Sequence, residues 1–187
     1  MEETKDGDKE SFEKLVLKHR KNAVGFAYGI LKDIYMAEDI VQESFASIYI
    51  NRHSYKSKNT FKTFLFAIIR NKCIDFIRKT KNYSAVNLDD ISVLSTDLQP
   101  QELFQQKEEL QHSIEVLNKL NEDYRIAFYL YEVEGFSYKE IAEIMHKSLP
   151  QIKITIYRAR KKLREFLKED IGRSEERRVG KECSQGV

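Results

Sequence analysis

The chain has 187 residues, of which 41% are hydrophobic and 33% charged, with only two prolines and seven glycines. This composition fits one ordinary domain or two small ones and argues against a β-sandwich, a β-barrel or a long disordered segment. The net charge of +2 excludes no class of partner. No apolar run approaches the ~20 residues needed for insertion into a membrane. The two cysteines are isolated from each other, which predicts a reduced, cytoplasmic protein.

The first 80 residues carry apolar side chains at helical spacing. We predict three helices here, the third of which runs from about Thr60 to Arg78. Their apolar faces are marked by Phe12, Leu15, Val16, His19, Ala23, Phe26 and Ile30, then by Ala37, Ile40, Val41, Phe45 and Ile48, and finally by Phe61, Phe64, Leu65, Ile68, Ile69 and Phe76. Between residues 81 and 104 the periodicity fades, and an acidic, polar composition predicts a flexible linker.

Four further helices are predicted after the linker. Leu103, Leu110, Ile114 and Leu117 mark the first, and the others span about 122–133, 137–145 and 149–168. Gly172 is predicted to end the last helix. Residues 173–187 have no apolar face, and because RSEERRVGKEC resembles a translated sequencing adapter we expect a non-native tail. The predicted fold is all-α, with two small helical domains at 8–80 and 105–170 joined by the linker.

The charge is distributed unevenly along the chain. Residues 50–81 carry a net charge of +8, residues 82–124 carry −7, and residues 147–164 contain seven basic side chains and no acidic one. Concentrated basic segments are typical of phosphate-binding surfaces. For one such segment taken alone, a solvated helix face is the favoured interpretation.

Residues 135–163 predict a helix-turn-helix. Ser137 and Glu140 have the spacing of a capping box, as have Ser148 and Gln151, and Pro150 falls in the first turn of the second helix, where its missing N–H costs nothing. The second helix is polar and basic on its outer face, which suits docking in the major groove of DNA. The alternative is an ordinary helical hairpin.

Two other helices carry polar patterns of interest. In the second helix, Asp39, Gln42 and Glu43 share one exposed face. An acid–base or metal site is the enzymatic interpretation, but no histidine or third carboxylate completes it. In the third helix, basic residues alternate with aromatic ones, a pattern that suits single-stranded nucleic acid, although most of these rings also fit a buried core.

Two stretches resemble bacterial RNA polymerase sigma factors of the extracytoplasmic-function type. LNEDYRIAFYLYEVEGFSYKEIAEIMHKSLPQIKITIYRARKKLREFL is similar to their region four, which reads the −35 promoter element. The resemblance implies −35 contacts from Ser148, Pro150, Gln151, Lys153, Ile154, Thr155 and Arg158. His146 stands where the family often has a turn glycine, and histidine tolerates a left-handed backbone better than most residues.

The second resemblance lies in the first domain. AEDIVQESF is similar to the segment that grips the largest polymerase subunit, which implies a core-binding role for Asp39, Gln42 and Glu43. FKTFLFAIIRNKCIDFIRK is similar to the region that recognises and melts the −10 element. It implies DNA contacts from Lys62, Phe64, Arg70, Asn71, Lys72, Asp75 and Arg78.

The resemblance implies a transcription initiation factor rather than an enzyme. Its expected partners are core RNA polymerase and promoter DNA, as duplex and as melted strand. An anti-sigma factor is a further candidate, and no cofactor and no metal are expected. The alternatives are a helix-turn-helix regulator that does not join polymerase, and a nucleic-acid-processing enzyme. The enzyme has the least support, because the sequence shows neither a P-loop nor an H-E-x-x-H motif.

Overall fold

The computed structural model describes residues 9–54, 60–86, 117 and 119–183. For residues 54, 81–86 and 169–183 it describes the backbone alone. Every element in these ranges is helical, which confirms the all-α class. The elements are α2 (Lys9–Leu31), α3 (Ile34–Ile50), the 3₁₀ helix η1 (Arg52–Ser54), α4 (Phe61–Val86), α6 (Glu122–Glu132), α7 (Tyr138–Met145) and α8 (Leu149–Cys183). The helix predicted around Leu103–Leu117 and most of the predicted linker lie outside the described residues.

Two predicted helix ends are wrong. The third helix continues past Arg78 to Val86, and the last helix continues through Gly172 to Cys183. A glycine in a helix interior costs only about 1 kcal/mol, and glutamate, lysine and arginine on both sides of Gly172 favour helix. Without a proline to break the backbone hydrogen bonds, neither polar segment ends its helix.

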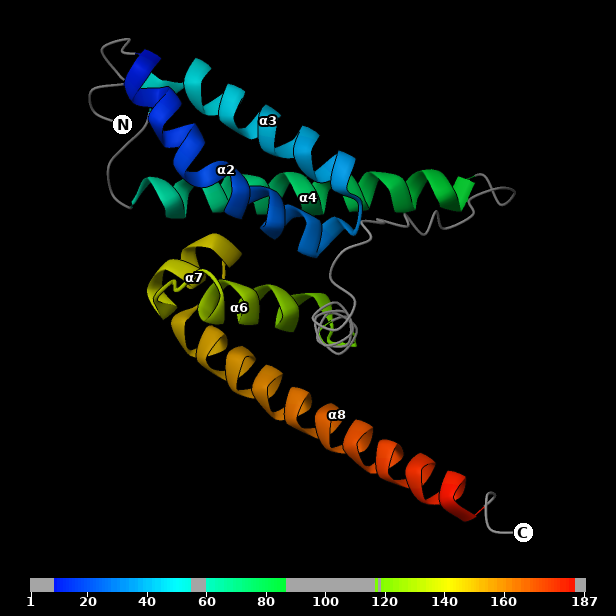
Figure 1. The fold of residues 1–187 in the computed structure, drawn as a ribbon. Coiled ribbons are helices and arrows are strands. Elements are labelled where there is room, and N and C mark those ends of the chain that lie inside the picture. Colours follow the sequence, from blue (N-terminus) through cyan, green and yellow to red (C-terminus); the bar gives the residue numbers. More distant parts are fainter. Residues whose placement is uncertain (1–8, 55–59, 87–116, 118, 184–187) are drawn as a thin grey trace.

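The helices form two units (Figure 1). In the three-helix unit, α2, α3 and α4 each pack against the other two. In the helix-turn-helix unit, α6, α7 and α8 likewise pack on one another, and α8 extends away from the rest of the molecule. The units also contact each other, because α7 packs on α4 and α6 packs on α2. None of the described helices combines the length and the apolarity that crossing a bilayer requires.

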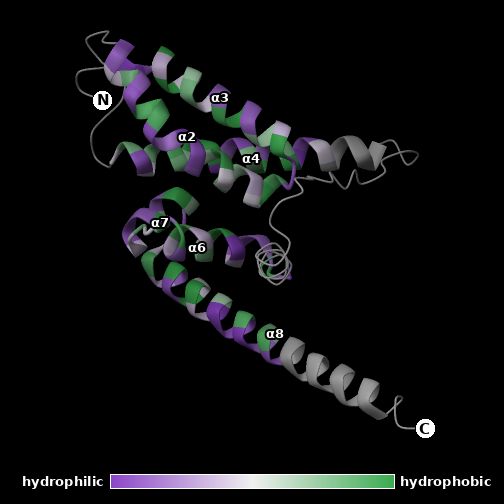
Figure 2. Ribbon diagram, in the orientation of Figure 1, coloured by the Kyte–Doolittle hydropathy of each residue, from purple (hydrophilic) through white to green (hydrophobic). Residues whose placement is uncertain are grey.

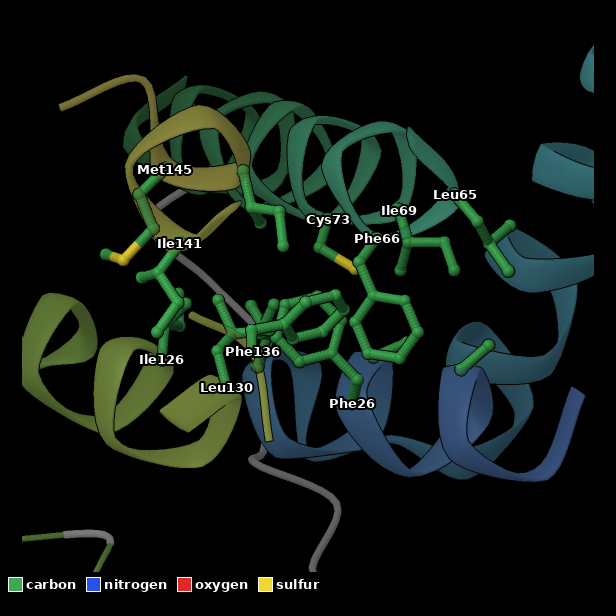
Figure 3. Packing of buried hydrophobic residues seen from close by; sticks show 14 of the residues in the cluster. Phe26, Leu65, Phe66, Ile69, Cys73, Ile126, Leu130, Phe136, Ile141 and Met145 are labelled. Carbon is green, nitrogen blue, oxygen red and sulfur yellow. The ribbon is translucent and has the colours of Figure 1, made fainter. Parts of the chain in front are cut away.

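One continuous apolar core runs through both units (Figure 3). Phe66 of α4 is completely buried at its centre. Its ring centroid lies 5.0 Å from that of Phe26 on α2 and 5.1 Å, edge on, from that of Phe136 in the α6–α7 connection. The two units therefore pack on each other and share one core, and we call this the closed arrangement.

The buried side of α4 matches the predicted apolar stripe only in part. The fully buried side chains are Leu65, Phe66, Ile69 and Cys73, whereas the predicted stripe residues Phe61, Ile68 and Phe76 are half-buried. Leu65 and Ile69 belong to the predicted stripe, whereas Phe66 and Cys73 do not. The helix-turn-helix unit also packs on α4, through α7. Figure 2 shows hydrophobic and hydrophilic residues interleaved along α4.

Candidate nucleic-acid interface

The helix-turn-helix is built by local hydrogen bonds. Ser137 caps α7 in a reciprocal capping box with Glu140. His146 ends α7 in the left-handed conformation, with φ 52° and ψ 44°, so the turn keeps its geometry without a glycine. Ser148 and Gln151 then bond reciprocally at the start of α8, with Gln151 Oε1 accepting from the Ser148 amide at 2.8 Å. Both predicted capping boxes are present.

An open cleft of about 430 Å³ lies between the first turn of α6 and the outer face of α8. Four predicted −35 residues line it, together with Lys147, which forms an ion pair with Asp123. The four residues are Gln151, Ile154, Thr155 and Arg158. The remaining predicted −35 residues, Ser148, Pro150 and Lys153, are exposed nearby in the first turns of α8.

Two residues of α8 depart from the predicted pattern, in which the outer face of this helix carries polar, exposed side chains. Thr155 is only 9% exposed, so its side chain lies at the base of the cleft rather than on an open surface. Ile154, in contrast, is 50% exposed although it is apolar. α6 packs on α8, and Thr155 lines the cleft together with Asn121, Asp123 and Tyr124 from the start of α6. A ligand must enter the cleft to reach its hydroxyl.

The carboxylate face of α3 is exposed as predicted. Asp39, Gln42 and Glu43 all point into solvent, while Ile40 and Val41 are buried against α2 and α4. Glu43 forms an ion pair with Lys72 of α4 at 3.0 Å, which joins the predicted polymerase-binding face to the predicted −10 helix. The Asp33 side chain caps α3 by accepting from the amides of Tyr35 and Met36.

The two halves of the chain match two family models. Residues 15–83 match Sigma-70 region 2 and residues 114–163 match Sigma-70, region 4. The extracytoplasmic-function (ECF) RNA polymerase sigma factor SigM of Bacillus subtilis is 33% identical over 147 residues, which cover 74% of this chain and 84% of that protein. The chain belongs to the ECF sigma factors.

Further relatives agree in length and fold. The ECF sigma factor SigX of Bacillus subtilis is 27% identical over 186 residues, covering 95% of each chain. The solved structure of the sigma factor RpoE in complex with the anti-sigma factor NepR from Bartonella quintana is 28% identical, has a TM-score of 0.73 and covers 84% of this chain and 97% of that one. This sigma factor is accordingly a promoter-specific transcription initiation factor, whose partners are core RNA polymerase and promoter DNA.

The predicted −10 residues of this sigma factor fall into two groups. Lys62, Arg70 and Asn71 lie in the contact with the helix-turn-helix unit. Of the others, Phe64 is half-buried, Lys72 pairs with Glu43, and Asp75 and Arg78 are exposed. The sequence pattern gave no sign that the first group has partners within the chain.

Four polar contacts join α4 to the helix-turn-helix unit, and we call them the interdomain seam. Lys62 Nζ lies 2.9 Å from Glu134 Oε2 and also donates to the Glu134 carbonyl. The Thr63 hydroxyl donates to Glu140 Oε1 at 2.9 Å, and Asn71 Nδ2 lies 3.2 Å from His146 Nε2. Each pair joins residues more than 70 positions apart.

Electrostatics at the seam reflect its burial. The Glu134 side chain is only 1% exposed, and its carboxylate contacts Lys62 and accepts a hydrogen bond from Asn22 at 3.1 Å. Burial raises the pKa of Glu140, but hydrogen bonds from Ser137 and Thr63 outweigh it and hold this pKa below its usual value. Sequence reasoning missed Glu134 and Glu140 as interdomain contacts, because an acidic residue near a turn usually remains in solvent.

Other chemistry is limited within the described part of the chain. No three His, Cys, Asp or Glu side chains there gather closely enough to hold a metal ion. Cys73 is completely buried, and this burial raises the pKa of its thiol to about 12. A thiol with so high a pKa is almost entirely protonated at neutral pH and is a poor nucleophile.

Proposed function

We propose that α8 reads the −35 element through the cleft beside α6. The observation that supports this most strongly is the convergence of Gln151, Thr155 and Arg158 on one polar cleft at the start of a basic helix. Glutamine, threonine and arginine side chains can hydrogen-bond base edges in the major groove. Lys153 and Lys161 of the same helix are both exposed, and exposed lysines can neutralise DNA phosphates.

We propose further that α4 binds the −10 element and helps to melt it, and that the exposed face of α3 binds core polymerase. Residues 8–80 would then form the polymerase- and −10-binding domain, 81–104 the linker and 105–170 the −35-binding domain. In this proposal the chain performs no chemistry of its own and acts in the cytoplasm. An anti-sigma factor is a further proposed partner, because the similar RpoE chain was solved with one.

The closed arrangement is not the promoter-bound one. The −35 and −10 positions of a promoter are 25 base pairs apart. At ~3.4 Å per base pair, this separation is about 85 Å along the axis of B-DNA. In the structure α4 packs directly on α7. One chain cannot contact both elements unless the two units separate.

Co-elution with core RNA polymerase tests the function, and a charge reversal tests the α3 face. Asp39→Lys combined with Glu43→Lys should weaken core binding at least tenfold without unfolding the chain, because both side chains are exposed. Glu10→Lys with Glu13→Lys makes the same charge change on exposed positions of α2 and serves as the control.

The outcomes separate the candidate functions. If the parent chain fails to co-elute with core polymerase at moderate salt, the protein is better described as a DNA-binding regulator. Equal core affinity in the α3 variant and the α2 control would instead remove only the polymerase-binding role of α3.

A further inference from the structure

A small pocket lies between α2 and α6, where these two helices pack together. Its volume is about 160 Å³, and three aromatic residues line it, namely Tyr28 from α2 and Phe128 and Tyr129 from α6. An apolar protein cavity of about 150 Å³ can hold a benzene molecule. The pocket therefore has room for one six-membered ring among aromatic side chains.

Gly29 leaves part of the pocket wall without a side chain. A Cβ atom placed on Gly29 would meet no other atom within 4 Å, whereas one placed on Gly25 would lie 3.1 Å from the Tyr129 hydroxyl. Close packing therefore explains Gly25 but not Gly29. A glycine within a helix weakens it relative to alanine. The chain keeps the space beside Gly29 open although a larger residue would favour α2.

Two basic side chains, Lys32 and Arg125, line the same pocket. Arg125 Nε donates to the Gly29 carbonyl at 3.1 Å, and Arg125 Nη1 lies 3.5 Å from the Leu120 carbonyl. These bonds fix the guanidinium and use two of its five N–H groups. Among the described residues, neither Lys32 nor Arg125 forms a salt bridge.

The electrostatics of the pocket favour a negatively charged ligand. Burial, and to a lesser extent the charge of Arg125, lower the pKa of Lys32 to about 8. Burial also lowers the pKa of Arg125, although Glu122 opposes this effect. An anion close to both side chains would stabilise their charged forms. A carboxylate is such an anion, and it accepts hydrogen bonds from both ammonium and guanidinium groups.

The backbone at Lys32 gives independent support. Lys32 follows the last residue of α2 and has a φ of 63°, in the left-handed region. Its amide donates to the Tyr28 carbonyl at 2.9 Å, as in the helix ends where glycine is usual. A lysine is disfavoured in this conformation. The helix end does not explain the lysine, whereas a role for its ammonium at the pocket does.

We propose that this pocket binds a small aromatic monocarboxylate. The aromatic ring lies among Tyr28, Phe128 and Tyr129, and the carboxylate accepts hydrogen bonds from Lys32 and Arg125. The site is independent of the proposed function, because none of its residues belongs to the proposed polymerase, −10 or −35 contacts. Since α2 and α6 belong to different units, the bound ligand contacts both units and stabilises their packing.

The test is isothermal titration calorimetry of the full chain with phenylacetate at neutral pH. We expect saturable binding at one site with a Kd below about 1 mM, which is within reach of a ligand of about ten non-hydrogen atoms. Phenylacetamide has the same ring and nearly the same shape but no charge. We expect it to bind at least tenfold more weakly than phenylacetate.

Two variants and a control locate the binding. Gly29→Leu places a side chain in the open space and should abolish binding, while leucine favours helix over glycine. Lys32→Asn removes the ammonium, and asparagine tolerates the left-handed backbone, so phenylacetate should bind at least tenfold more weakly. Lys21→Gln removes the same charge from an exposed position of α2 and should keep the parental affinity. Gly29→Ala, with at least threefold weaker binding, replaces Gly29→Leu if the latter does not fold.

Four results would overturn the proposal. The first is no saturable binding of phenylacetate to the parent chain in the millimolar range. The second is equal affinity for phenylacetate and phenylacetamide, because the basic side chains would then not select an anion. Parental affinity in the Gly29 variants would place the ligand elsewhere. Equal losses in Lys32→Asn and Lys21→Gln would indicate general attraction to positive charge.

Discussion

Phe66→Ala tests whether the two units share one core. The Phe66 side chain is completely buried and touches one aromatic ring from each unit, Phe26 and Phe136. Truncating a buried phenylalanine costs about 3–5 kcal/mol of the free energy of unfolding. For a chain of this size each kcal/mol lowers Tm by roughly 2–4 °C. We therefore expect Tm to fall by about 6–20 °C.

A double-mutant cycle isolates the interdomain part of this loss. Phe136→Ala removes the partner ring from the helix-turn-helix unit, and the edge-on pair should contribute a coupling energy of about 0.5–1.5 kcal/mol. Urea unfolding of the parent, the two single variants and the double variant gives the four free energies. If the single losses add to within about 0.3 kcal/mol, the rings do not touch in solution and the closed arrangement is not populated.

Three further predictions concern base recognition, pH and capping. Arg158→Ala should reduce discrimination among −35 sequences by about 1–3 kcal/mol if the guanidinium contacts a base, and a uniform loss across sequences in a binding assay would identify a phosphate contact instead. Burial and the charges of Lys18 and Lys62 lower the pKa of His19, against an opposing effect of Glu134, so the unfolded chain takes up a proton more readily than the folded one. The contribution of His19 to the free energy of unfolding should therefore be fully present above the pKa of about 6.5 that histidine has in the unfolded chain, and it should be lost as the pH falls through and below that value. In a plot of the urea midpoint against pH, His19→Gln should flatten this part of the curve. Ser137→Ala should lower the free energy of unfolding by about 1 kcal/mol through loss of the α7 cap, whereas an unchanged urea midpoint would show that the cap is dispensable.

Much of the local structure could be predicted from the sequence. The capping boxes at Ser137 and Ser148, the left-handed turn at His146 and the exposed carboxylates of α3 all depend on interactions within about four residues along the chain. Residue type and spacing along the chain are therefore sufficient to predict such interactions. The ends of α4 and α8 were mispredicted because polar composition and a single glycine do not outweigh favourable helix propensity.

The sequence by itself determined the helices, the helix-turn-helix and the family to which the chain belongs. Only the tertiary structure decided that the helix-turn-helix unit packs on α4, that Phe66 and Cys73 are in the core, and that Glu134 and Glu140 face the −10 helix. The physical reason is the range of the interactions. Helix formation is governed by neighbours along the chain, whereas the seam joins residues more than 70 positions apart, and no pattern of local spacing specifies which face of α4 a distant unit will cover.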